Sequence, residues 1–125
     1  MGSRLLLVGG GHAHLFVLEG LIQGRFPRGL AVTVVAPDRR HAYSGMVPGL
    51  VAGHYAVDDC VIPLAPLAAR AGVRWVEAAA SAFDANARRV VLADGRELEY
   101  DVASLDTGAV ILRDAIAGAR EHALF

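Results

Sequence analysis

Cysteine, lysine and long apolar runs are all scarce in this sequence. Its one cysteine, Cys60, excludes an internal disulfide and a two-cysteine redox pair, and we expect a reducing, cytoplasmic setting. The first apolar run, residues 5–8, ends at a glycine, so we expect no secretory signal. No stretch is long enough to span a bilayer, so we expect no membrane segment. Cys60 itself is either a small buried apolar group, as lone cysteines usually are, or a reactive thiol.

Neither sign of charge is in large excess. The 125 residues hold 12 basic and 13 acidic side chains, for a formal net charge of −1, and every basic residue is an arginine. This balance gives no long-range attraction to nucleic acid, so we predict no such partner. Hydrophobic residues make up 54% of the chain, more than an average soluble domain carries. We therefore expect apolar surface that is covered by segments outside this chain or that pairs two chains as a homodimer.

The chain is organised around residues 4–18, where a short apolar run leads through three glycines into an apolar helix. The run is typical of a strand buried on both faces of a parallel sheet. Gly9, Gly10 and Gly11 then allow a tight turn, and the helix predicted from about residue 11 to 23 directs its free N–H groups over it. This arrangement is typical of an anion site, most often for a dinucleotide pyrophosphate. Apolar residues on nearly all sides of the helix predict that it packs in the interior.

The glycine spacing departs from the dinucleotide fingerprint at one place. The pattern asks for glycine at its first, third and sixth positions, and here Gly9 and Gly11 fit while His14 takes the sixth. A histidine there implies that the helix stands off the sheet or that the imidazole turns aside. The alternative interpretation is a glycine-rich turn that binds no ligand.

A second strand predicted over residues 30–35 completes a βαβ unit. Adenosine-binding folds usually place an acidic ribose ligand at the end of this strand. Here the first carboxylate, Asp38, comes two positions late, and it either reaches the ribose from the loop or is a solvated turn residue. For the pair that follows, Arg39 and Arg40, exposure to solvent is favoured over phosphate binding.

Residues 41–55 interleave apolar and aromatic side chains with glycine and proline, which is not typical of a flexible linker. A loop of this kind favours lining a flat aromatic ligand, with Tyr43, Ser44 and Met46 as the candidate contacts. The alternative is an ordinary turn at Pro48 that leads into a short helix.

The remaining pattern predicts an α/β fold. A proline-started helix over 63–71 precedes a third strand over 72–78, which extends a parallel βαβαβ sheet. Alternating polarity on both sides of an Asp-Gly turn predicts an antiparallel meander over 79–100. A last strand over 101–106 ends in Thr107-Gly108, at the carboxyl edge where open α/β sheets bind ligands.

Two acidic residues, Asp58 and Asp59, come just before the predicted 63–71 helix. Acidic side chains in that position complement the positive end of a helix dipole. Because no third ligand lies nearby in the sequence, we expect this structural role and predict no metal site.

The glycine segment and residues 43–55 together resemble the FAD-dependent pyridine nucleotide-disulfide oxidoreductase family. The resemblance runs along the whole chain and is nearest to the NADH dehydrogenase-like flavoproteins, the branch also found fused to selenide, water dikinase. It implies a Rossmann-like FAD/NAD(P)-binding three-layer fold with a parallel central sheet and a small antiparallel meander, incomplete at the C-terminus. Residues 1–125 would then be the N-terminal part of an FAD-binding domain, with βαβαβ over about 3–78, a meander over about 79–100 and a last strand over about 101–107.

The resemblance also implies a set of cofactor contacts. The first segment would cradle the FAD pyrophosphate, the Tyr-Ser-Gly-Met segment would lie near the flavin, the backbone near residue 80 would meet the adenine, and Thr-Gly would abut FAD beside the glycine turn. The candidate cofactor-binding residues are Gly9, Gly10, Gly11, His12, Ala13, His14, Ala36, Pro37, Asp38, Tyr43, Ser44, Met46, Ala80, Thr107 and Gly108.

The sequence departs from the family at several positions. Ala36 stands where many relatives have the acidic ribose ligand, Asp106 replaces the commoner alanine before Thr-Gly, and the paired redox cysteines are absent. Disulfide reduction is therefore not expected, and no catalytic residue is assigned, since the cofactor would supply the chemistry.

Two functions of different class follow. The first is the FAD-binding portion of an NAD(P)H-dependent flavin oxidoreductase, whose nicotinamide domain is missing here, so that this chain alone is expected to be inactive. The second is a stand-alone nucleotide-binding module, or a truncated fragment, without catalytic turnover. A second glycine-rich dinucleotide motif beyond Phe125 would distinguish the first from the second.

Overall fold

A four-stranded parallel sheet forms the centre of the computed structural model, which describes residues 2–109 and 112–123. The strands follow the spatial order β5-β2-β1-β9. Their bounds are β1 (Arg4–Val8), β2 (Ala31–Ala36), β5 (Arg74–Glu77) and β9 (Val102–Leu105). A separate antiparallel sheet contains β6 (Ala80–Asp84), β7 (Arg89–Leu92) and β8 (Glu97–Glu99). The predicted α/β class, with a parallel central sheet and a small antiparallel one, is confirmed.

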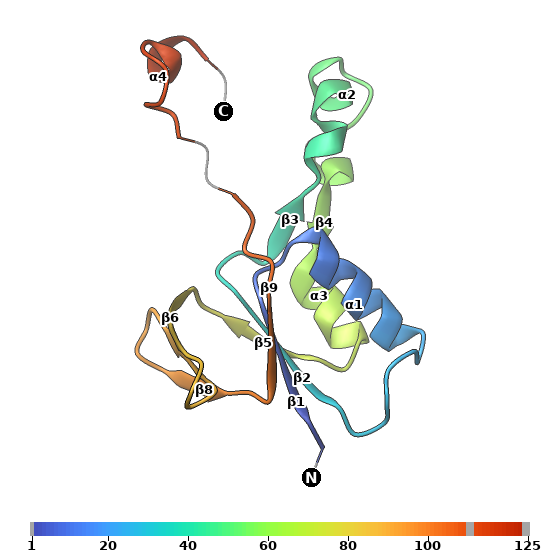
Figure 1. Cartoon of the computed structure of the whole chain (residues 1–125). Coiled ribbons are helices and arrows are strands. Elements are labelled where there is room, and N and C mark those ends of the chain that lie inside the picture. Colours follow the sequence, from blue (N-terminus) through green and yellow to red (C-terminus); the bar gives the residue numbers. More distant parts are fainter. Residues whose placement is uncertain (1, 110–111, 124–125) are drawn as a thin grey trace.

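Three layers are visible in Figure 1, with helices on one face of the parallel sheet and the antiparallel sheet on the other. The two helices are α1 (His12–Ile22) and α3 (Leu64–Arg70). The alternation of side chains along each strand supplies both interfaces. Leu7 and Val34 pack towards the helices with Leu18 of α1 and Ala68 of α3.

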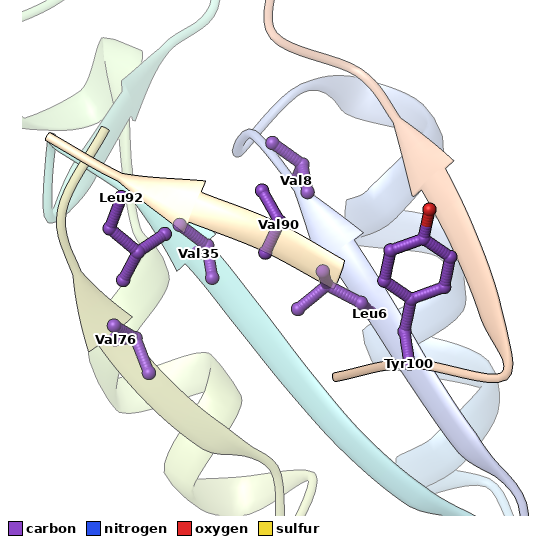
Figure 2. Close-up of a cluster of buried hydrophobic side chains, with 7 residues drawn as sticks. All are labelled: Leu6, Val8, Val35, Val76, Val90, Leu92 and Tyr100. Carbon is purple, nitrogen blue, oxygen red and sulfur yellow. The ribbon is translucent and has the colours of Figure 1, made fainter. Parts of the chain in front are cut away.

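The opposite face of the sheet carries a second core cluster, drawn in Figure 2. Leu6, Val35 and Val76 come from three parallel strands, and they pack against Val90 and Leu92 of β7. Each of these side chains is at most 3% exposed. The antiparallel sheet is therefore fixed to the parallel sheet by a continuous apolar contact and is not a loose appendage.

Helix α1 is less enclosed than the sequence predicts. Its apolar residues run nearly all round, but only one side meets the sheet and α3, and Phe16 on the outer side is 71% exposed. The expectation of an interior helix is therefore wrong for the described part of the chain, because no described element covers that outer side.

A projecting arm separates β2 from α3. It consists of β3 (Arg40–Ala42), a 3-10 turn η1 (Ser44–Met46), α2 (Val47–Val51), a second turn η2 (Val57–Cys60) and β4 (Val61–Pro63). Strands β3 and β4 pair with each other in a sheet of their own. Figure 1 shows this pair carrying α2 away from the parallel sheet, beyond the first turn of α1. A short helix α4 (Ala119–His122) lies near the end of the described chain.

The role predicted for Asp58 and Asp59 is wrong. Both lie in η2, and the intervening strand β4 separates them from α3, which begins at Leu64 and not at a proline. The Asp59 carboxylate instead accepts a hydrogen bond from the Ala56 N–H at 2.9 Å. Asp59 therefore stabilises its own turn and not α3, because a three-residue strand that the sequence pattern does not reveal lies between them.

Candidate functional site

The glycine turn between β1 and α1 is packed so closely that side chains would collide on it. Gly9 has a φ of +99°, a backbone conformation that favours glycine. A Cβ atom on Gly9 would lie 2.0 Å from the Asp106 carbonyl oxygen, and one on Gly10 would lie 2.4 Å from Leu64 Cδ1. A Cβ atom on Gly11 would lie 2.2 Å from the carboxyl carbon of Asp106. Each glycine therefore permits a close approach by a residue distant in the sequence.

A cavity of about 280 Å³ opens above this turn. It lies at the carboxyl ends of β1, β2 and β9. The chain leaves β1 towards β2 on one side and returns to β9 on the other, so β1 and β9 flank a topological switch point, where open α/β sheets bind ligands. The lining residues are Val8, Gly9, Gly10, Gly11, Val35, Ala36, Pro37, Asp38, Arg40, His41, Leu64, Ala79, Ala80, Thr107 and Gly108. The volume is at the lower limit of small-molecule sites and suits part of a dinucleotide better than the whole.

His14, at the sixth position of the fingerprint, is 1% exposed and bonded at both ring nitrogens. Its Nδ1 lies 2.7 Å from the Gly9 carbonyl oxygen, and its Nε2 lies 2.9 Å from Ser104 Oγ of β9. Because a carbonyl only accepts, Nδ1 carries the proton, and in the neutral ring Nε2 accepts from the hydroxyl. The imidazole thus joins α1 to the glycine turn and to the neighbouring strand, and it does not line the cavity.

Asp106, the unusual residue before Thr-Gly, lies against the N-terminus of α1. Its carboxylate accepts a hydrogen bond from the Ala13 N–H at 2.9 Å, and its carbonyl accepts one from the Gly11 N–H at 3.2 Å. The carboxylate thereby satisfies one of the free N–H groups of the helix. The backbone N–H groups of Gly10 and His12 have no hydrogen-bond partner within residues 2–109 and 112–123. These two donors remain available to a ligand.

Strand β3 contributes His41, which the sequence interpretation missed, and Arg40, for which it favoured exposure to solvent over phosphate binding. Arg40 and His41 both line the cavity, whereas Arg39 points to Glu77, with a nitrogen–oxygen distance of 3.4 Å. Arg40 forms no ion pair with any carboxylate of the described residues. Both arginines are exposed, as the sequence predicts, and Arg40 also lines the cavity. The loop after β2 turns back into β3, and the sequence pattern held no signal for a strand of three residues.

His41 also contacts the first turn of α1. Its Nε2 lies 3.1 Å from His12 Nδ1, and the two rings meet edge to face with centroids 4.6 Å apart. Burial is the main reason that the pKa of His41 falls below its ordinary value. The neighbouring His12 lowers that pKa further, and the carboxylate of Asp106 opposes both effects.

The predicted cofactor contacts fall into two groups. Those on the strand ends line the cavity: Gly9, Gly10, Gly11, Ala36, Pro37, Asp38, Ala80, Thr107 and Gly108. The others do not: His12 and Ala13 lie on the first turn of α1, His14 is buried behind the turn, and Tyr43, Ser44 and Met46 lie in the arm between β3 and α2. Tyr43 contacts His12 of the same group, with the two ring centroids 5.1 Å apart.

Cys60 is 5% exposed, and its Sγ lies 3.5 Å from the Ala56 carbonyl oxygen. This burial agrees with the interpretation of Cys60 as a small apolar group. Within the described ranges, no cluster of histidine, cysteine, aspartate and glutamate is arranged to hold a metal ion. No helix in the same ranges combines the length and apolarity needed to cross a membrane.

No protein-family model matches the chain, but individual proteins do. Over 108 residues it is 25% identical to the sulfide-quinone reductase of Aquifex aeolicus, covering 86% of this chain and 25% of that protein. The crystal structure of that enzyme superimposes with a TM-score of 0.81 at 22% identity, covering 96% of this chain and 27% of the other. An NADH dehydrogenase-like protein of Mycobacterium tuberculosis is 30% identical over 121 residues, 95% of this chain and 30% of its own length.

A further structural neighbour is NDH2 of Plasmodium falciparum, solved in complex with NADH. It superimposes with a TM-score of 0.73 at 15% identity, covering 97% of this chain and 25% of that one. The chain spans about a quarter of the length of the curated relatives it matches. Its homologues and structural neighbours are FAD-dependent pyridine nucleotide-disulfide oxidoreductases, and the chain corresponds to a fragment of these larger proteins.

Proposed function

We propose that this chain is the FAD-binding portion of a pyridine nucleotide-dependent flavin oxidoreductase. The observation that carries the proposal is the cavity over the glycine turn, at the switch point of a parallel sheet. Its composition suits a nucleotide diphosphate. The N–H group of Gly10, which lines the cavity, and that of His12 on the adjacent first turn of α1 lack partners among the described residues. Arg40 adds a cation that forms no ion pair with a described carboxylate.

Apolar groups complete the fit. Val8, Val35 and Leu64 line the cavity beside the polar turn, and an adenosine needs such surfaces for its ring. FAD, when bound, supplies hydride chemistry between a nicotinamide and an electron acceptor. The contribution of this chain is to bind the cofactor and to orient it.

Within this proposal each lining residue has a role. Gly9, Gly10 and Gly11 would admit the diphosphate together with the N-terminal residues of α1, His12 and Ala13, and Thr107-Gly108 would close its other side. Asp38, beside Ala36 and Pro37, would bind the ribose hydroxyls, and Ala80 would meet the adenine. His14 would act indirectly, by holding the turn. Tyr43, Ser44 and Met46 would lie towards the flavin, because the cavity is too small for the whole cofactor.

The relatives are longer than this chain, which supports a proposal for the domains of the whole protein. We propose that residues 1–125 form the N-terminal part of the FAD-binding domain, divided as the sequence predicts, and that NAD(P)H is the co-substrate, bound by a further domain. We also propose a cytoplasmic location.

β9 is an edge strand on which Val102 and Leu105 are about 60% exposed. We propose that two chains can pair there, and a monomeric mass in light scattering would refute that pairing.

The absorption spectrum of the chain after incubation with FAD and desalting tests the main proposal. Ala79 is exposed and lines the cavity, so Ala79→Trp should obstruct the site and abolish flavin retention without disturbing the core. Ala69→Trp, on an exposed position of α3 outside the cavity, is the matched control and should retain flavin like the parent chain. Equal loss or equal retention in both variants would place any bound flavin elsewhere.

A further inference from the structure

Two sides of the cavity differ in the charge of their side chains. Gly9, Gly10 and Gly11 contribute only backbone, while β3 contributes Arg40 and His41. Arg40 is permanently charged, whereas His41 can change its charge within the physiological range. The state of His41 therefore decides how strongly this side of the cavity attracts an anion.

His41 is held so that one additional proton changes its hydrogen-bonding capacity. At 3.1 Å, a single proton lies between His41 Nε2 and His12 Nδ1, donated by one ring and accepted by the other. An imidazolium at His41 would donate through Nε2 to His12, and its Nδ1–H would be left over as a second donor. Nδ1 of His41 has no hydrogen-bond partner among the described residues.

The charged and titratable groups around His41 come from three other directions. Helix α1 places His12 against it, the end of β9 places the Asp106 carboxylate nearby, and the segment after β3 places the Tyr43 ring against His12. Arg40 precedes it on β3. Without a bound anion, burial and His12 outweigh Asp106 and hold the pKa of His41 below its ordinary value. An anion in the cavity would add a second negative group and favour the imidazolium.

We propose that binding of a nucleotide diphosphate in this cavity is coupled to uptake of one proton by His41, which then donates to His12 through Nε2 and to the diphosphate through Nδ1. The proton comes from solvent, and no covalent bond changes. The inference rests on the proposed function, because it assumes that the diphosphate lies in this cavity. The sign follows from linkage: if the anion raises the pKa of His41, binding is tightest at low pH and weakens as the pH rises through the bound-state value.

Calorimetric titration of the chain with ADP-ribose tests the coupling. Its diphosphate is a diester and keeps its charge across the range, so only protein groups titrate. Between about pH 5.5 and about pH 8 we expect affinity to fall about tenfold, since a pKa shift of one unit on binding corresponds to a tenfold change. At intermediate pH, two buffers of different ionisation enthalpy should reveal proton uptake. Adenosine, which lacks the diphosphate, should show neither effect.

Three variants isolate His41. His41→Gln should bind ADP-ribose weakly and without pH dependence, and His41→Arg, with a fixed charge, should bind tightly across the whole range. His54→Gln, on the arm and outside the cavity, should retain the parent slope. A slope that persists in His41→Gln, or binding by the parent chain without a slope, overturns the inference and leaves the proposed function standing. Absence of ADP-ribose binding at every pH overturns both.

Discussion

The carboxyl edge of the parallel sheet and the projecting arm both carry predicted cofactor contacts, yet they are built differently. At the sheet edge the turn is held by residues far away in the sequence: Asp106 bonds to Gly11 and Ala13, and Ser104 bonds to His14. The arm is held mainly by its own neighbours, as in the bond from Ala56 to Asp59. The turn at the edge is thus held by long-range contacts among the described residues, whereas α2 at the far end of the arm carries exposed apolar side chains such as Val51.

The largest loss of stability is expected for Gly9→Ala at the sheet edge. Alanine would be strained at a φ of +99°, and its Cβ would overlap the Asp106 carbonyl, so we expect about 3 kcal/mol or more of destabilisation. Gly24→Ala is the matched control, because Gly24 also has a positive φ, +70°, but nothing lies within 4 Å of its added Cβ. It should cost about 1 kcal/mol from backbone strain alone. Urea denaturation measures both, and equal losses would mean that the close packing of the turn contributes nothing.

The next largest effect is expected for His14→Leu. The substitution leaves the buried Gly9 carbonyl and the Ser104 hydroxyl without their partner, at a cost of about 2–4 kcal/mol. His54→Leu on the exposed arm removes a histidine without a buried hydrogen bond and should change the free energy of unfolding by less than about 0.5 kcal/mol. Comparable melting temperatures for the two variants would contradict the role of His14 as the link between α1 and β9.

The contrast between local and long-range contacts also explains which features of the fold and of the candidate site could be predicted from the sequence. The strand–glycine–helix order predicted the turn, because a buried strand and a positive φ restrict residue choice locally. The partner of His14 could not be predicted, since Ser104 lies 90 positions away and a single serine carries no pattern. The place of His41 in the cavity was missed, and phosphate binding by Arg40 was not favoured, because β3 is only three residues long. The sequence placed the glycines and Thr107-Gly108 at the strand ends. The positions of Arg40 and His41 depended on the tertiary pairing of β3 with β4.

A smaller effect, on affinity and not on stability, is expected for Asp106→Asn. The asparagine oxygen can still accept from the Ala13 N–H, so the turn is preserved while the negative charge at the N-terminus of α1 is lost. At about pH 8, ADP-ribose should bind about fivefold more tightly, since two like charges near a protein surface repel by about 1 kcal/mol or more. Asp58→Asn, on the arm, is the control with an equal change in net charge. If both variants gain affinity equally, the effect is one of net charge and not of the position of Asp106.

The smallest effect is expected for Val51→Ser, at the C-terminal end of α2. Val51 is 78% exposed, so removing its apolar surface should change the free energy of unfolding by less than about 0.5 kcal/mol. Val76→Ala offers the contrast, because Val76 is 3% exposed in the cluster of Figure 2 and its truncation should cost more than about 1 kcal/mol. The free energies from urea denaturation separate the two cases. A loss above 1 kcal/mol for Val51→Ser would mean that the arm is covered in solution, by a second chain or by folding back, and the contrast between the sheet edge and the exposed α2 would fail.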